Sequence, residues 1–194
     1  SSLLTGCGAI GNKAFSLSSI YCAAAVLALL LLIFYLHLFS KRDRWFLLLF
    51  SSIFVVNTGY FILSISKSLE IALWANRIAY LGSAMLPLAM LMIIFYVCKI
   101  CYSKWLPYLF FGISFIVFLI AASPGYLNIY YQSVSLEIIN GVSTLNKVYG
   151  PWHSIYLFYL VIYFSLMIAS IIHATKKGKI ESNIHAIILA LAVF

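Results

Sequence analysis

The stretch RIAYLGSAMLPLAMLMIIFYVCKI, residues Arg77–Ile100, indicates what kind of protein this chain is. It is a long apolar run with an arginine at one end and a lysine near the other. A helix needs about 20 apolar residues to cross the hydrocarbon core of a bilayer. Extended back to Leu73, the segment reaches that length. It therefore predicts a membrane-spanning helix over about Leu73–Val97.

The composition of the whole chain agrees with this reading. Among its 194 residues, 65% are hydrophobic and only 8% are charged, whereas about 25% of the residues of a soluble domain are charged. The aromatic share of 17% also fits, because Trp and Tyr collect at membrane–water interfaces. The chain is predicted to be an integral membrane protein whose surroundings are a lipid bilayer.

Six apolar segments, separated by polar or charged links, mark the expected spans. These are about Leu17–Phe39, Trp45–Ile65, Leu73–Val97, Trp105–Ala122, Pro151–Ala174, and a sixth from Ser182 that is cut off at Phe194. We therefore expect an all-α, polytopic membrane helix bundle over residues 17–194. An extracellular tail over residues 1–16 precedes it, and a long outer loop over residues 123–150 interrupts it.

The distribution of basic residues predicts the orientation of the bundle. Eight of the twelve Lys and Arg residues lie after the first, third and fifth spans. Since basic residues mark cytoplasmic loops, the amino terminus is expected outside. The sixth span then leads outward, so a cytoplasmic domain that follows it would require one more span. We expect a seven-helix unit whose seventh helix is missing from this piece.

Several function classes are disfavoured by the charges. The net charge of +8 is scattered between apolar runs, which indicates topology rather than a nucleic-acid surface. The carboxylates lie in loops or at helix ends, and buried intramembrane acids are typical of proton-coupled transporters. The four carboxylates are Asp43, Glu70, Glu137 and Glu181.

Metal and cofactor chemistry is not expected. The histidines do not share a helix face at metal-binding spacing; they are His37, His153, His173 and His185. Cys98 and Cys101 form a C-x-x-C at the end of a span without a second pair or a nearby histidine, so a structural role is the favoured interpretation. No catalytic constellation is present in the sequence, and we expect no enzymatic activity of the chain itself.

Two interpretations of Arg77 remain open. Its guanidinium could reach the headgroups, with Trp74 as an interfacial anchor. Alternatively, it could face the outer mouth of the bundle and hold an anionic ligand group or a loop carboxylate such as Glu137. Asn57 in the second span is a candidate either for hydrogen bonds between helices or for ligand contact.

Two features of the third span concern its packing. The small residues Gly82, Ser83 and Ala84 predict close approach of a neighbouring helix. Pro87 lacks an N–H and predicts a kink unless its neighbours accommodate it.

The outer loop shows partial alternation of apolar and polar residues. The stretch NIYYQSVSLEIIN followed by Gly141 predicts a β-hairpin with Asn140–Gly141 as its tight turn. Such a hairpin could form a lid over the bundle mouth near Arg77, Trp74 and Trp152. A loop that merely connects two spans is the alternative.

The stretch WANRIAYLGSAMLPLAMLMIIFYVCK resembles the third helix of the amino-terminal seven-transmembrane region found on many bacterial sensor histidine kinases and some diguanylate cyclases. Arg77, the Tyr80–Leu81–Gly82 step and Pro87 carry the resemblance. The stretch YGPWHSIYLFYLVIYFSLMI carries it again at the start of the fifth span, with Gly150, Pro151, Trp152, His153 and Tyr156. Leu88 departs from the family pattern, which has a second proline there. The resemblance extends over about Leu17–Phe194.

The resemblance implies a sensor module of the bacterial plasma membrane that acts on a cytoplasmic signalling domain of the same full-length chain, with a homodimer as a further expectation. An unknown small extracellular ligand would bind at the outer end. The candidate ligand-binding residues are Arg77, Trp74, Asn57, Tyr80, Trp152 and His153. A small-molecule transporter or channel is the alternative function. A lipid-modifying membrane enzyme is the third, but Asp43 alone does not supply its catalytic groups.

Overall fold

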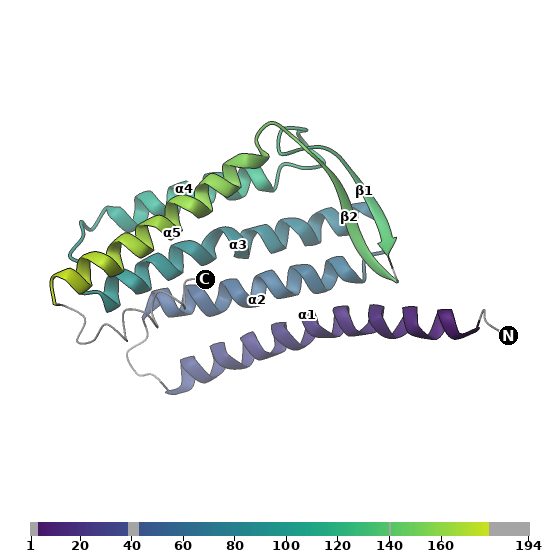
Figure 1. Cartoon of the computed structure of the whole chain (residues 1–194), viewed down its shortest axis with the longest axis horizontal. Coiled ribbons are helices and arrows are strands. Elements are labelled where there is room, and N and C mark those ends of the chain that lie inside the picture. The colour runs from purple at the N-terminus through teal and green to yellow at the C-terminus, as the bar shows by residue number, and fades with distance from the viewer. Residues whose placement is uncertain (1–3, 39–42, 140, 179–194) are drawn as a thin grey trace.

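The computed structural model describes residues 4–38, 43–139 and 141–178 of the chain. Five helices and a two-stranded antiparallel sheet make up this part (Figure 1). The elements are α1 (Leu4–Leu38), α2 (Arg44–Ser64), α3 (Leu69–Val97), α4 (Leu106–Ala121), β1 (Tyr131–Ile139), β2 (Val142–Tyr149) and α5 (His153–Lys176). The fold is therefore mostly helical rather than all-α, because the outer loop forms a hairpin.

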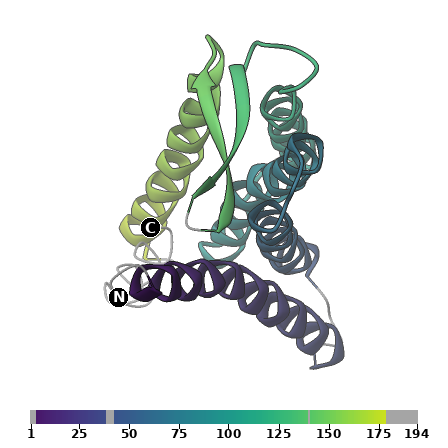
Figure 2. The same cartoon turned by 90° about the vertical axis from the view of Figure 1, so that its right-hand side faces the viewer.

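Helix α3 lies at the centre of the bundle. It packs against α2, α4 and α5, whereas α1 packs mainly on α2. In α3, 61% of the residues of the apolar window are buried, against 11%, 17% and 28% in the other three candidate spans. Figure 2 shows the hairpin crossing one end of the bundle, between α5 on one side and α2–α4 on the other. A movement of the hairpin at this end therefore reaches the helix with the most neighbours.

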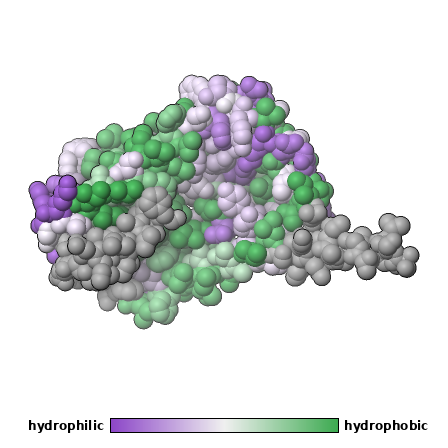
Figure 3. All heavy atoms as spheres, in the orientation of Figure 1, coloured by the Kyte–Doolittle hydropathy of each residue, from purple (hydrophilic) through white to green (hydrophobic). Residues whose placement is uncertain are grey.

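Four of the helices in the described residues are long and apolar enough to cross a membrane. They are Leu17–Leu38 within α1, then α2, α3 and α5. Helix α4, at 16 residues, is shorter than these spans. The space-filling view shows apolar residues along the helices, with hydrophilic residues at the hairpin and at the opposite end (Figure 3). The expected sixth span lies outside the described residues, so neither six nor seven spans are confirmed.

The expected boundaries agree with the structure except at the amino end. The ranges predicted for the second to fifth spans match α2, α3, α4 and α5 to within a few residues. Residues 1–16 were expected as a tail, but α1 begins at Leu4. That segment is therefore helical from Leu4 onward.

Helices α2 and α3 touch through glycines. A Cβ atom on Gly59 would lie 2.5 Å from the backbone nitrogen of Ala79, and one on Gly82 would lie 2.6 Å from the backbone oxygen of Ser52. These distances leave no room for a side chain. The close approach that the sequence predicts at Gly82 is confirmed, and it is the packing that small residues allow between membrane helices.

Helix α3 continues through Pro87 without a break. Near this position it packs on α5, where Tyr159 donates a hydrogen bond to the carbonyl oxygen of Ala84 at 2.6 Å. The buried hydroxyl of Ser114 on α4 lies 2.9 Å from the hydroxyl of Tyr159. Because buried polar groups are costly unless paired, these bonds fix α3, α4 and α5 relative to one another.

Candidate functional site

The outer loop between α4 and α5 forms a hairpin, as the sequence predicts. Asn140, the first residue of the predicted turn, lies outside the described residues. Strands β1 and β2 pair in register from Ile139–Val142 at the tip to Tyr131–Tyr149 at the base, with an irregularity between Tyr131 and Ser133. Gly141 in the turn has a positive φ of 80°, a conformation that glycine adopts without steric cost. The prediction of a hairpin in the outer loop is confirmed.

Close backbone contact holds the base of the hairpin. The N–H of Gly150 donates to the carbonyl of Tyr130 at 2.9 Å, and that of Trp152 donates to the carbonyl of Ile129 at 3.1 Å. A Cβ on Gly150 would lie 2.4 Å from the Ile129 oxygen. Only glycine fits at this position, three residues before α5 begins at His153.

Two hydrogen bonds join β2 to the helices beneath it. Lys147 Nζ donates to Oδ1 of Asn76 on α3 at 3.2 Å. The hydroxyl of Ser143 donates to the carbonyl of Ser66 in the link between α2 and α3. Asn76 and Ser143 are both buried. The hairpin is thus packed on the bundle instead of standing free in solvent.

A cluster of tyrosines lies next to these bonds. The hydroxyls of Tyr80 on α3 and Tyr131 on β1 are 2.6 Å apart, and the hydroxyl of Tyr130 donates to that of Tyr80 at 3.5 Å. Tyr130 and Tyr131 are almost completely buried. Burial raises the pKa of both hydroxyls, so these tyrosines remain neutral hydrogen-bonding groups.

Lys147 is a partly buried cation among these rings. Its ammonium group lies 5.1 Å from the ring centre of Tyr131 and 5.9 Å from that of Tyr80, within the range of cation–π attraction. Its hydrogen-bond acceptor is an amide oxygen of Asn76 rather than a carboxylate. Burial lowers the pKa of the amine, because a desolvated charge is disfavoured.

Arg77, on the same helix, has different partners from Lys147 and the tyrosines. Its Nε donates to the carbonyl of Ala122 at 3.1 Å and its Nη2 to that of Pro124 at 2.7 Å. The guanidinium also lies 4.8 Å from the ring centre of Trp74 and 4.3 Å from that of Tyr126. Arg77 therefore binds the carboxyl end of α4, where carbonyls favour a cation.

Within the described part of the chain, Arg77 does not hydrogen-bond to Glu137, the loop carboxylate that was one of its expected partners. Glu137 Oε1 accepts a hydrogen bond from Nδ2 of Asn146 on the partner strand at 2.6 Å. Arg77 instead donates its hydrogen bonds to the backbone carbonyls of Ala122 and Pro124. The hydrogen bonds described for Arg77 thus lead to the end of α4 and not to Glu137, and a contact with headgroups stays a prediction.

The other predicted site residues do not form one site with Arg77; each has its own surroundings. Tyr80 lies in the tyrosine cluster, and His153 stacks on Tyr149 with ring centres 4.0 Å apart. Trp152 is 47% exposed at the start of α5. Asn57 on α2 donates to the carbonyl of Ile53 in its own helix. Among the described residues, no hydrogen bond or ring contact joins Asn57 to the other five candidates.

Lys147 and Asn76 were not predicted as partners. A signal was present in the alternation of β2, because Lys147 and Tyr149 are two residues apart and so lie on one face of the strand. The register adds Tyr131 directly opposite Tyr149. The alternation does not, however, indicate which helix this face of the strand packs on.

The chain matches a known protein family. The family model described as the N-terminal 7TM region of histidine kinase covers residues 20–194. No curated protein matches the chain, and no solved structure does. Because the family match extends over most of the sequence, the chain belongs to the N-terminal 7TM region of histidine kinases, as its sequence predicts.

Proposed function

We propose that this member of the histidine kinase 7TM family is the signal-input domain of a bacterial sensor kinase in the plasma membrane. It detects an extracellular or membrane-borne stimulus at the hairpin-covered end and passes it to a cytoplasmic kinase domain of the same full-length chain. The bundle itself carries no catalysis. Family membership supports the sensor role, and the packing of the hairpin on α3 supports the place of detection.

The bond between Lys147 and Asn76 is the observation that carries the mechanism. It connects β2, which lies at the surface, with a residue only 2% exposed in the central helix. A stimulus that moves the hairpin must break or rearrange this bond together with the contact between Tyr80 and Tyr131. Helix α3 then loses polar contacts on one side only and can shift against α2 and α5.

A sensor requires two arrangements and a stimulus that favours one of them. In the proposed mechanism the docked hairpin is one arrangement and the displaced hairpin is the other. The exposed part of the hairpin is what a ligand would reach first; Ile138 and Ile139 at its tip are 67% and 53% exposed. A ligand that binds both arrangements equally would cause no signal.

The test uses the full-length protein in nanodiscs and measures autophosphorylation with labelled ATP. Lys147→Gln and Asn76→Ala each remove the same hydrogen bond. Both variants should shift the basal rate in the same direction, and the double variant should add little, because coupled residues are not additive. Lys67→Gln, which removes an exposed charge at the same end, is the control and should leave the rate unchanged.

Unchanged basal rates in both single variants, or effects that simply add in the double variant, would contradict the mechanism. Transport is the competing function, and flux through proteoliposomes from the same preparation distinguishes the two. A homodimer stays a prediction from the family resemblance, to be measured by the mass of the detergent-solubilised protein.

A further inference from the structure

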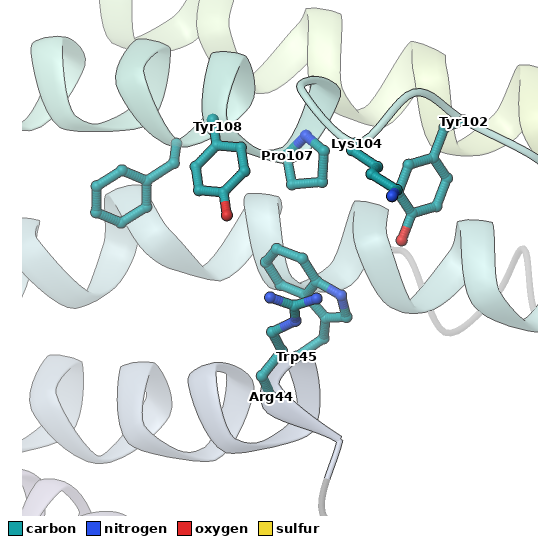
Figure 4. Close-up of a pocket in the computed structure, with 7 residues that line it drawn as sticks. Arg44, Trp45, Tyr102, Lys104, Pro107 and Tyr108 are labelled. Carbon is teal, nitrogen blue, oxygen red and sulfur yellow. The ribbon is translucent and has the colours of Figure 1, made fainter.

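A second polar site lies at the opposite end of the bundle from the hairpin. A cavity of about 600 Å³ opens between the start of α2, the link from α3 to α4, and the start of α4. Figure 4 shows Arg44 and Trp45 on one side and Tyr102, Lys104, Pro107 and Tyr108 on the other. The distribution of basic residues assigns this end to the cytoplasm.

The lining of the cavity is positively charged. Arg44 and Lys104 supply two cations, and the described residues that line the cavity include no carboxylate. Tyr102, Tyr108 and Trp45 add groups that can donate hydrogen bonds. The nearby carboxylate of Asp43 is occupied as the N-cap of α2, where it accepts a hydrogen bond from the backbone N–H of Trp45 at 2.8 Å.

The other wall of the cavity is apolar and continues onto the outer face of α4. Phe111 lines the cavity and is 49% exposed. Its ring is nearly parallel to that of Phe115, with centres 6.4 Å apart, and Phe115 and Leu119 are also exposed along the same helix. An acyl chain can therefore follow α4 from the cavity toward the middle of the membrane.

We propose that this cavity binds the headgroup phosphate of an anionic phospholipid from the cytoplasmic leaflet. Arg44 and Lys104 would hold the phosphate, since guanidinium groups bind phosphate oxygens through paired donors. Tyr102 and Tyr108 would contact the glycerol region, and Phe111 the first part of an acyl chain. Basic pockets between helices on the cytoplasmic side are suited to such headgroups.

The apolar wall favours a lipid over free phosphate. A free phosphate ion would gain nothing from Phe111 and Phe115, whereas a phospholipid satisfies the cations and covers the exposed rings together. The site is independent of the proposed detection at the hairpin. Its failure would leave the sensor proposal standing, because none of its residues contributes to the hairpin contacts.

The experiment measures retention of phosphatidylglycerol by the full-length protein with native mass spectrometry, against phosphatidylcholine as the neutral lipid. The double variant Arg44→Gln/Lys104→Gln should weaken phosphatidylglycerol binding roughly tenfold and leave phosphatidylcholine unaffected. Lys176→Gln removes a charge at the same end, in the last turn of α5, and should have little effect.

Three outcomes would overturn the proposal. These are equal retention by the double variant and the original protein, an equal loss in Lys176→Gln, and displacement of phosphatidylglycerol by millimolar inorganic phosphate. A measurement without variants gives the fourth check: retention by the original protein should fall as salt concentration rises, because the attraction is between exposed charges. Retention that does not depend on salt would also contradict the site.

Discussion

Nζ of Lys147 on β2 donates a hydrogen bond to Oδ1 of Asn76 on α3 across 3.2 Å. One residue belongs to the hairpin and the other to the most buried helix of the bundle. The pair therefore joins the surface of the molecule to its centre.

The stability of the protein should depend on pH through Lys147. Its pKa in the folded state is below the ordinary value of 10.5, so the unfolded state binds more protons in the interval between the two pKa values. Stability should therefore rise as the pH increases from the folded pKa toward 10.5, and should level off below the folded pKa, where the amine is protonated in both states. The measurement is the thermal midpoint in detergent across this pH range.

In Lys147→Met this contribution is absent. The difference in stability between the original protein and the variant should increase with pH, while Tyr130 and Tyr131, whose pKa values are raised by burial, stay neutral in both proteins. A difference that stays constant from neutral pH to pH 10.5 would show that the amine is not desolvated.

Asn76→Ala should destabilise the protein by about 1–3 kcal/mol, because it leaves the partly buried amine of Lys147 without its acceptor. Asn57→Ala is the matched control, since the Asn57 side chain bonds within its own helix; it should cost about 0.5 kcal/mol or less. Equal losses of stability in the two variants, measured by thermal unfolding, would contradict the role of Asn76.

The hydroxyls of Tyr80 and Tyr131 should be energetically coupled. Single Phe substitutions and their combination form a double-mutant cycle, and we expect an interaction of about 0.6–2 kcal/mol. Tyr108 is 68% exposed, so Tyr108→Phe combined with Tyr80→Phe should be additive. Coupling of similar size in both cycles would rule out a specific bond between Tyr80 and Tyr131.

Gly82→Ala should cost about 1–3 kcal/mol, because the new methyl group would meet the backbone of Ser52 and force α2 and α3 apart. Gly112→Ala on α4 is the control. A Cβ there meets nothing within 4 Å, and alanine favours the helix by up to about 1 kcal/mol. The two substitutions should therefore change the thermal midpoint in opposite directions.

Arg77→Gln should loosen the carboxyl end of α4. The amides of Tyr126 and Leu127 donate to the carbonyl of Ser123, and Arg77 holds the carbonyls on either side of it. Hydrogen exchange in peptides covering residues 122–127 should become faster in this variant and stay unchanged in Lys67→Gln. Unchanged exchange in Arg77→Gln would revive the interpretation that Arg77 serves a ligand rather than α4.

The regular elements could be predicted from the sequence because their signals are local. Apolar length marks α2, α3 and α5, and the pair Asn140–Gly141 between alternating residues marks the hairpin turn. Gly82 could be predicted as a close contact, since a small residue in a membrane helix has few other uses. Whether Pro87 kinks α3 could not be predicted from the sequence. The outcome depends on whether the neighbouring helices accommodate the proline.

The candidate site was only partly predictable. Tyr80 and His153 contact residues of the hairpin, whereas Asn57 bonds in its own helix and Arg77 binds backbone carbonyls. The identity of a polar residue in a span indicates that it needs a partner. It does not indicate which partner, because the candidates are separated by many residues along the chain.

The sequence by itself determined that this chain belongs in a membrane and where its main helices and its hairpin lie, because hydrophobic length and turn chemistry act between neighbours. Only the tertiary structure decided that Lys147 meets Asn76, that Tyr131 meets Tyr80 and that Arg77 holds α4. Those pairings follow from how the hairpin docks on α3. Docking depends on shape and hydrogen bonds between segments that no local pattern connects.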